Sequence, residues 1–344
     1  MGVAIGVDSH KSSFAAAAVD EVGRELKRRE FGNNAKGHRQ ALKWARAIGS
    51  DSIFGIEGSG RYGAGLARVL LASGEDVREV PPFLSHRERK RTPSKGKSDL
   101  SDAVAIARIV ARGEGLVPLV GARLHEDLRL LSDHRDQLVH TRTRLANRVH
   151  KDLSIMHPGY EQQIPKLTRK KQLAAAEALL GADGSVRARL ARERIEDLFH
   201  LDARIAAVTK EIAARVTETG TTLTRLTGIS FVLAARILGE IGDPRRLGSK
   251  ACFAMLNGTA PLEASSGNTR RHRLNRKGNR KLNFVLHRMA IVCCRVDADT
   301  KNYMAGKVAE GKSKKEALRC LKRHLSNVVH RQLLADLERG AIAA

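Results

Sequence analysis

Hydrophobic positions near the start of the chain form short runs separated by turn residues. Residues 3–7 and 13–19 are apolar runs of strand length, and residues 24–31 alternate weakly between polar and apolar positions. An acidic turn at Asp20, Glu21 and Gly23 follows the second run. Short runs joined by short turns predict a three-stranded antiparallel meander.

Beyond the meander, strand and helix patterns alternate. Residues 52–56 form a buried-strand run and residues 76–80 an extended segment, while 40–48 and 66–71 have helical spacing. The Asn33–Asn34 pair suits the N-cap region of the first of these helices. Strands interleaved with helices predict an α/β layer architecture.

The pattern then becomes predominantly helical. Residues 86–97 (HRERKRTPSKGK) are basic and contain Pro and Gly, which predicts a loop, and residues 98–111 have helical spacing. Residues 124–149 and 173–216 are long charged helical patterns, interrupted at 157–165 by two prolines and a glycine. They predict an antiparallel helical hairpin or coiled-coil arm; a compact helical bundle is the alternative.

From Leu223 onward, the sequence LTRLTGISFVLAARILGEIGD places a glycine turn between two apolar helical stretches. This pattern is typical of a helix–hairpin–helix unit, whose backbone amides can hold a phosphate without reading sequence. We therefore expect three domains, at residues 1–115, 116–217 and 218–344.

The net charge of the chain indicates which class of molecule it binds. Sixty-two Lys and Arg residues against 37 Asp and Glu give a formal net charge of +25. Such an excess causes self-repulsion in the folded state, so a polyanion, foremost nucleic acid, is the simplest partner. A generally basic surface from a genome that favours Arg codons is the alternative.

The sequence also shows no pattern of a membrane span, a signal peptide or a zinc site. No apolar run reaches the roughly 18 residues that span a bilayer, and the N-terminal residues have no signal-peptide pattern. The four cysteines show no zinc-type spacing. We expect reduced thiols in a cytoplasmic, prokaryotic nucleoid-associated protein.

Four carboxylates could form a metal site. Asp8 and Glu57 end two predicted strands, and Asp99 and Asp102 share one face at the start of a helix. Oxygen ligands suit Mg²⁺, and two such ions about 4 Å apart would stabilise a phosphoryl transfer. Individually, Asp99 or Asp102 could instead cap the helix, with Ser98 or Ser101 sharing that work, and Asp8 could form a turn.

Basic residues form a second constellation near two serines. Ser265 and Ser266 precede Gly267, where a hydroxyl nucleophile would be sterically open. Seven cations follow without an acid: Arg270, Arg271, Arg273, Arg276, Lys277, Arg280 and Lys281. Together with the cations of residues 86–97, which are Arg87, Arg89, Lys90, Arg91, Lys95 and Lys97, they are candidate phosphate contacts. The alternative is a turn serine before an ordinary basic face.

These motifs, in this order, resemble the DEDD insertion-sequence transposases. The likeness lies in IGVDSHK around Asp8, GIEGSGRYG around Glu57, KSDLSDA around Asp99 and Asp102, and the run 228–282. It spans nearly the whole chain, although the middle segment matches only in being helical and NGTAP at 257–261 matches loosely.

The resemblance implies an α/β ribonuclease H-like N-terminal domain, a helical coiled-coil arm and a mainly α C-terminal transposase domain. It implies a Mg²⁺-dependent recombinase with Asp8, Glu57, Asp99 and Asp102 as ligands. It also implies a serine nucleophile that becomes linked to DNA: Ser266 by motif position, with Ser265 as the fallback.

The resemblance further implies that the protein binds double-stranded DNA, both at the ends of the element and at the target. It also makes a structured guide RNA a candidate partner. Because the carboxylates and the serine are remote in sequence, we expect a homo-oligomer, a dimer or tetramer. Two alternatives stay open: a Mg²⁺-dependent resolvase or nuclease that uses water as nucleophile, and a non-enzymatic architectural binder.

Overall fold

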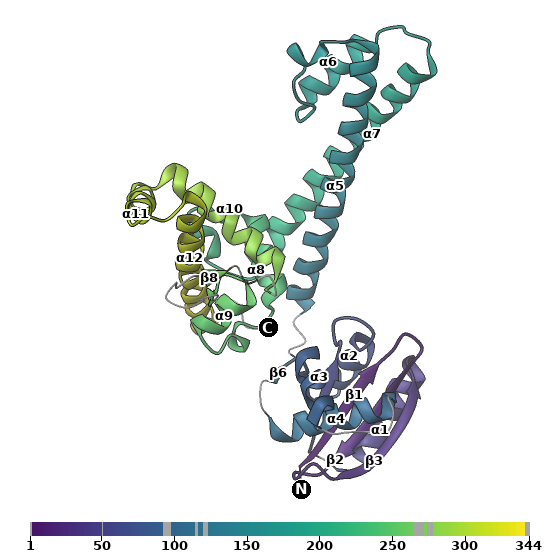
Figure 1. Ribbon diagram of the computed structural model, residues 1–344. Coiled ribbons are helices and arrows are strands. Elements are labelled where there is room, and N and C mark those ends of the chain that lie inside the picture. Colours follow the sequence, from purple (N-terminus) through teal and green to yellow (C-terminus); the bar gives the residue numbers. More distant parts are fainter. Residues whose placement is uncertain are drawn as a thin grey trace. The chain divides into compact units, whose positions relative to one another are not determined.

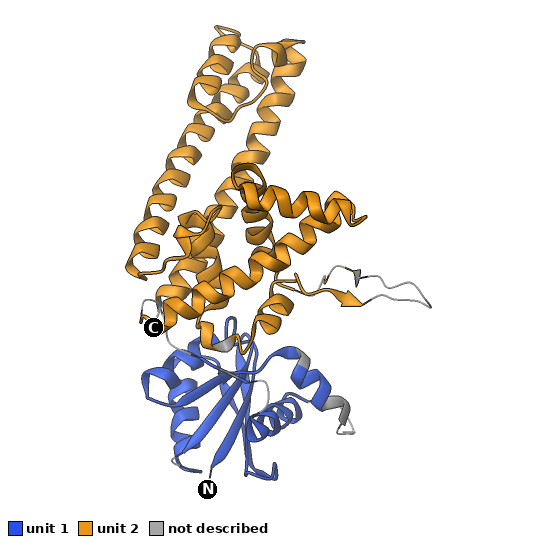
Figure 2. Ribbon diagram, turned by 90° about the vertical axis from the view of Figure 1, so that its left-hand side faces the viewer, with its two compact units in different colours: residues 1–121, 344 blue, residues 122–343 orange. Residues whose placement is uncertain are grey.

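The chain folds into two units, residues 1–121 and 122–343, which Figure 2 shows in different colours. The computed structural model describes residues 2–49, 51–91, 98–113, 116–119, 123–263, 272–273, 275 and 278–340. Each unit has hydrophobic clusters of its own.

The first unit is built on one six-stranded mixed sheet. Its strands are β1 (Val3–Ser9), β2 (Ser13–Val19), β3 (Glu25–Gly32), β4 (Ser52–Glu57), β5 (Asp76–Glu79) and β6 (Val117–Pro118). The order is β3-β2-β1-β4-β5-β6. Strands β1 to β3 form the predicted antiparallel meander, whereas β4 is parallel to β1 and β5 is parallel to β4. The α/β prediction for this part of the chain is confirmed; the short strand β6 was not predicted.

Helices cover both faces of this sheet. They are α1 (Ala35–Arg46), α2 (Ala64–Ala72), α3 (Pro82–Arg91) and α4 (Asp99–Arg112). Side chains alternate along β1, so Val3, Ile5 and Val7 share a cluster with residues of α1 and α2. Ala4, on the opposite face, shares a cluster with residues of α3 and α4. Asp8 has the same parity as Ala4 and therefore belongs to the α4 face.

The loop predicted at residues 86–97 is wrong over its first half. Helix α3 continues to Arg91, and residues 92–97 lie outside the described part of the chain. Pro82 suits the first position of a helix, and the Arg, Glu and Lys residues that follow have high helix propensity. Glu88 is 5% exposed and accepts two hydrogen bonds from Arg112 of α4, at 3.1 and 2.5 Å. The basic composition suggested a loop, but an ion pair between the buried Glu88 and the partly exposed Arg112 anchors a helix.

The second unit begins with a helical hairpin. Helices α5 (Arg123–Met156) and α7 (Val186–Glu218) run side by side, with η1 (Tyr160–Gln162) and α6 (Lys170–Leu180) at the far end (Figure 1). That end has a separate hydrophobic cluster, which includes Leu153, Leu173 and Leu198. The continuous helix predicted over 173–216 is wrong, because Gly181 has φ 49° and Ser185 caps a new helix.

Helices dominate the rest of the second unit. The elements are η2 (Leu223–Arg225), α8 (Phe231–Ile241), η3 (Pro244–Arg246), α9 (Lys250–Leu256), β7 (Leu262–Glu263), β8 (His272–Arg273), α10 (Arg280–Val296), α11 (Ala298–Ala309) and α12 (Lys314–Glu338). Their core also includes Leu128 of α5 and Ile212 of α7.

The expected helix–hairpin–helix differs from the structure in its first half. The stretch before Gly228 is only the three-residue 3-10 turn η2, whereas α8 follows as predicted, with Ser230 as its N-cap. A Cβ atom at Gly228 would lie 3.0 Å from the backbone oxygen of Met289. The turn therefore packs against α10 rather than joining two α-helices.

The predictions about membrane spans and cysteines can be compared with the structure. None of the helices in the described ranges is long and apolar enough to cross a membrane. All four cysteines are free, as expected for reduced thiols.

Candidate active site

Two strand ends bring the first pair of carboxylates together. Strands β1 and β4 carry the similar sequences IGVD and FGIE, and they pair in parallel with Gly6 opposite Gly55 and Asp8 opposite Glu57. Neighbouring strands lie about 4.8 Å apart, and partners in register point to the same face. Asp8 and Glu57 are therefore neighbours at the carboxyl ends of two parallel strands.

Glycine allows α4 to approach this face closely. A Cβ atom at Gly6 would lie 2.1 Å from the backbone nitrogen of Ala107 and 2.2 Å from the backbone oxygen of Ala103. At Gly55 it would lie 2.2 Å from a methyl carbon of Val110. Side chains at these two positions would force the helix away from the sheet. Their absence brings the first turn of α4 to the carboxylate end of β1.

The N-terminus of α4 does not need its acids as caps. Ser98 is the N-cap residue, and its hydroxyl accepts a hydrogen bond from the backbone N–H of Ser101 at 3.2 Å. Asp99 and Asp102 lie in the first turn, and Asp102 is only 7% exposed. The serine thus does the capping that we considered for the acids.

Electrostatics show that the four carboxylates share one environment. Burial raises the pKa of Asp8 most strongly; His10 lowers it, and the negative charges of Glu57, Asp102 and Asp99 raise it further. The net result is a raised pKa for Asp8. Like-charged carboxylates this close repel one another, so a cation between them would be stabilised.

Among the residues that the structure describes, His10 is the basic side chain that pairs with acids of this cluster. Its Nε2 lies 3.5 Å from Oδ2 of Asp8 and 3.2 Å from Oδ2 of Asp99. Ligand atoms of Asp8, His10 and Asp99 all lie within 4.8 Å of one another, close enough to hold one metal ion. The carboxylates offer the oxygen ligands that Mg²⁺ prefers, and the imidazole adds a nitrogen that suits Mn²⁺ or other transition metals.

Sequence reasoning missed His10. No other histidine lies at zinc-type spacing from His10 in the sequence. The signal was its position two residues after Asp8, because alternate residues at a strand end point the same way.

The other predicted site residues divide into those outside the described part of the chain and those within it. Outside the described residues are Ser265, Ser266, Lys95, Lys97, Arg270, Arg271, Arg276 and Lys277. Arg87, Arg89, Lys90 and Arg91 belong to α3, and the Arg87 side chain is exposed. Arg273 in β8 and Arg280 at the start of α10 are also exposed.

Lys281 was predicted as a phosphate contact, but it forms ion pairs within the chain. Its Nζ lies 2.6 Å from Oδ1 of Asp133 and 3.1 Å from Oε1 of Glu240. The same two acids pair with Arg236, which is 6% exposed, and a third acid, Asp136, lies 2.7 Å from it. This network connects α5, α8 and α10, so Lys281 joins the hairpin to the helices that follow it.

Comparison with known proteins gives two family matches. Residues 5–158 match a family model of the DEDD type for IS110, described as "Transposase". Residues 220–305 match a second model, described as "Transposase IS116/IS110/IS902 family". The first match contains all four carboxylates, and the second contains both serines.

Relatives from insertion elements match over nearly their whole length. An uncharacterized 44.8 kDa protein of insertion element IS116 from Streptomyces clavuligerus is 26% identical, over 94% of this chain and 93% of the relative. A 42 kDa protein of IS900 from Mycobacterium paratuberculosis is 23% identical, over 94% of both chains. A 43.6 kDa protein of IS110 from Streptomyces coelicolor is 23% identical, over 97% of this chain and 94% of the relative.

Solved structures give a weaker likeness. Thermus thermophilus RuvC in complex with Holliday junction substrate has a TM-score of 0.28 and 15% identity, covering 35% of this chain and 100% of that one. Another Thermus thermophilus RuvC structure has a TM-score of 0.27 and 16% identity, covering 34% and 99%. The family matches and the insertion-element relatives are more informative, and they identify this chain as a DNA transposase of the DEDD-type insertion sequences that include IS110, IS116 and IS902.

Proposed function

We propose that this transposase cuts and rejoins DNA strands at a divalent-metal site formed by Asp8, Glu57, Asp99 and Asp102. One observation carries the proposal: Asp8 is paired in register with Glu57, and the charges of all three other acids raise its pKa. Repulsion among four carboxylates is unfavourable unless a cation or a proton relieves it. A site for Mg²⁺ is the simplest reason to keep them together.

The residues of the cluster fit a divalent ion and divide the work of holding it. Asp8 and Glu57 are fixed by the sheet, and Asp99 and Asp102 by the first turn of α4. His10 lies between Asp8 and Asp99, where it orients both carboxylates through its Nε2. When bound, Mg²⁺ supplies positive charge that stabilises the oxygens of a phosphodiester during strand exchange.

The nucleophile in this proposal is Ser266, with Ser265 as the fallback. The serine Oγ attacks phosphorus and loses its proton, a P–Oγ bond forms, and the P–O bond to the sugar breaks. The released sugar hydroxyl takes up a proton. A hydroxyl from a second strand reverses these steps, so the bond energy is conserved and the strands are rejoined without another co-reactant.

The remaining features follow from the same proposal. The first unit is a ribonuclease H-like domain, supported by its mixed sheet with acids at the ends of adjacent parallel strands. The α5–α7 hairpin is a coiled-coil arm that contributes to a homodimer or homotetramer, and the C-terminal helices form the transposase domain. The partners are double-stranded DNA at element ends and target, with a structured guide RNA as an additional candidate.

A covalent adduct tests this function. The full chain is incubated with Mg²⁺ and DNA that carries the element's ends, then digested and searched by mass spectrometry for a DNA-linked serine peptide. We expect the adduct at Ser266 in the wild type and in Ser265→Ala, and its loss in Ser266→Ala and in Asp8→Asn.

Other results would point elsewhere. Continued cutting by Ser266→Ala and Ser265→Ala without any adduct would indicate a nuclease that uses water. Unchanged strand joining by Asp8→Asn and Glu57→Gln would contradict the metal site.

A further inference from the structure

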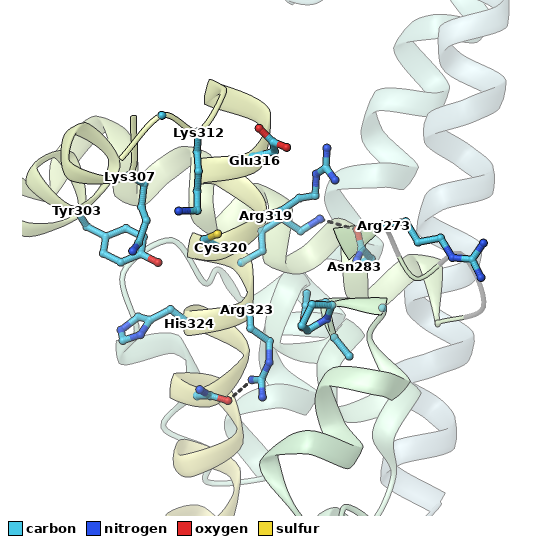
Figure 3. Close-up of a pocket in the computed structure, with 17 residues that line it drawn as sticks. Arg273, Asn283, Tyr303, Lys307, Lys312, Glu316, Arg319, Cys320, Arg323 and His324 are labelled. Atoms are coloured by element: carbon cyan, nitrogen blue, oxygen red, sulfur yellow. Dashed lines mark hydrogen bonds between the residues drawn. The ribbon is translucent and has the colours of Figure 1, made fainter. Parts of the chain in front are cut away.

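A second charged site lies in the C-terminal part of the chain, far from the carboxylates in sequence. It is a pocket of about 880 Å³ between the 257–261 turn, β8, α11 and the N-terminal half of α12, and we call it the α12 pocket. Figure 3 shows the side chains that line it, with those of α11 and α12 on one side and Arg273 on the other. Six cations line it: Arg273, Lys307, Lys312, Arg319, Lys322 and Arg323.

The charges of this pocket are only partly compensated within the chain. Lys307 and Lys312 pair with Glu310, at 2.8 and 2.7 Å. Among the described residues, by contrast, no ion pair joins Arg319, Lys322 or Arg323 to a carboxylate. Arg319, Lys322 and Arg323 lie within five residues of one another on α12, and Glu316 is the one acid among the described residues that line the pocket, so a ligand with several negative charges is attracted to it.

Lys322 is the most unusual of these cations. Its side chain is 8% exposed, and its Nζ donates a hydrogen bond to Oδ1 of Asn283 at 2.6 Å. Burial, and then the nearby charge of Arg319, lower the pKa of Lys322. An ammonium group has three N–H donors, so a buried one with an amide as its partner gains much from an anion.

A rigid network holds this lysine in place. Asn283 donates from its Nδ2 to the backbone oxygen of Asn257 at 2.8 Å, and Asn257 donates from its Nδ2 to Oγ of Ser326 at 2.8 Å. Asn257 is fully buried and also accepts hydrogen bonds from Thr259. The wall of the pocket is therefore pre-organised, which lowers the cost of binding.

The pocket adjoins the segment that carries the two serines. Pro261 and Arg273 both line it, and β7 pairs with β8 through Leu262 opposite Arg273. Residues 264–271, including Ser265 and Ser266, connect these two strands. An anion in the pocket would thus lie at the base of the hairpin that bears the proposed nucleophile.

We propose that the α12 pocket binds the phosphodiester backbone of the DNA strand next to the one that the serine attacks, with Lys322, Arg319 and Arg323 as its ligands. This inference deepens the proposed function and rests on it for the identity of the strand. The pocket positions DNA without reading bases, because its ligands are cations that contact phosphates.

Salt dependence of DNA binding provides the first test. The variant Arg319→Gln, Lys322→Met, Arg323→Gln is compared with a control that removes the same charge from exposed residues outside the pocket: Lys301→Gln, Lys315→Gln, Arg331→Gln. Binding of a duplex that carries an element end is measured from 50 to 200 mM salt. Each lost phosphate contact lowers the slope of log K against log salt by about 0.9. We expect a decrease of about 2 to 3 for the pocket variant and less than about 1 for the control.

A footprint on the wild-type chain avoids any effect of substitution on folding. Cys320 lines the pocket, whereas Cys252 is exposed on α9 and lies outside it. We expect saturating DNA to slow alkylation of Cys320 at least fivefold and to change that of Cys252 less than twofold. Equal slopes for both triple variants, or an unchanged Cys320 rate at saturating DNA, would overturn the proposal.

Two further arms identify the ligand. If an RNA hairpin, but not the DNA duplex, protects Cys320, the proposal for DNA is wrong. Inorganic phosphate at the same ionic strength should protect Cys320 much less than the duplex; equal protection would also contradict a DNA-backbone site. A wild-type chain that shows the pocket's salt slope and Cys320 protection but forms no serine adduct would refute the proposed function alone.

Discussion

Asp8 is the residue on which the candidate active site depends. It lies at the end of β1, its side chain is 17% exposed, and its pKa is raised by burial and by three neighbouring acids. A folded-state pKa above the unfolded value means that the folded protein loses stability as pH rises through that range, and carries the full penalty above it. Without metal, this carboxylate therefore destabilises the protein at neutral pH.

Asp8→Asn should accordingly raise the melting temperature of the metal-free protein at pH 7 while abolishing any increase caused by Mg²⁺. The wild type should gain stability with Mg²⁺, because an ion that binds only the folded state stabilises it. Differential scanning calorimetry with and without Mg²⁺ checks both effects. Asp51→Asn, an exposed acid of the same unit, is the control and should change neither. A variant that is less stable than the wild type without metal would contradict this account.

Single residues were only partly predictable from the sequence. The hydrophobic runs before Asp8 and Glu57 predicted that both acids end strands. The structure confirms this, because the two acids are paired at the ends of β1 and β4. The role of Ser98 as cap could be considered but not separated from capping by the acids. His10 was missed because its contact with Asp99 joins residues 89 positions apart, which a local pattern does not show.

At the scale of elements, the close packing of α4 on β1 positions the carboxylates. Gly6 leaves room for the helix backbone and Gly55 for the side chain of Val110, and each glycine precedes an acid by two residues on the same face. The pattern G-x-acid in both strands thus combines close packing with a ligand at the strand end.

Gly6→Ala should separate the two halves of the cluster. Its Cβ would meet backbone atoms of Ala103 and Ala107 at 2.2 and 2.1 Å, which no rotamer change can relieve. Overpacking of this kind costs roughly 1–3 kcal/mol of unfolding free energy. Chemical denaturation measures this loss, and Mg²⁺ titration should show weaker binding. Gly2→Ala, whose Cβ would meet its nearest neighbour at 3.7 Å, is the matched control. Equal stability of the two variants would show that α4 can move without cost.

Asp336 connects α12 to the segment before η2, and its contribution to stability should depend on pH. It is fully buried on α12 and accepts hydrogen bonds from both Thr221 and Thr222. Burial raises its pKa, but hydrogen bonds, foremost from Thr222 and Thr221, outweigh this and lower it overall. A lowered pKa contributes stability that is present above the unfolded-state pKa and is lost as pH falls through the folded-state pKa.

Asp336→Asn should therefore destabilise the protein by roughly 1.5–3 kcal/mol at pH 7, the usual value of hydrogen bonds to a charged group. The difference from the wild type should shrink as the pH is lowered towards acid. Urea denaturation at several pH values measures it. A difference that does not depend on pH would mean that packing, not charge, is responsible.

Elements whose packing is local were predictable, and those set by tertiary contacts were not. Strands β1, β2 and β4 followed from runs of apolar residues that are buried in the sheet. Helix α3 was mistaken for a loop because its anchor, the Glu88–Arg112 ion pair, joins two separate helices. The stretch before Gly228 has helical spacing but forms only a 3-10 turn, and Leu223 of that turn is buried in the same core as Ile229.

At the scale of the whole molecule, the proposed chemistry draws on two separate units. The carboxylates belong to the first and the serine segment to the second, and the net charge of +25 suits a long polyanion. The excess charge was evident from composition. The α12 pocket was not, because its cations come from residues that are far apart in the sequence, such as Arg273 and Lys322.

Neutralising the basic run should weaken DNA binding broadly. Substituting Arg270, Arg271, Arg273, Arg276, Lys277 and Arg280 with Gln removes candidate phosphate contacts, so affinity should fall for every sequence and the salt slope should flatten. Lys281→Gln alone should instead lower thermal stability, because Lys281 pairs with Asp133 and Glu240. Filter binding and thermal melting separate the two effects. An unchanged salt slope for the multiple variant would show that the run faces away from DNA.

Direct measurement of metal binding tests the central claim most closely. Electron paramagnetic resonance of free Mn²⁺, titrated with the full chain, counts bound ions, and Mg²⁺ should compete for them. We predict one or two ions per chain for the wild type and Asp51→Asn, and binding weaker by about tenfold or more for Asp8→Asn and Glu57→Gln, because each removes a charged oxygen ligand. Identical binding curves for all four proteins would contradict the account.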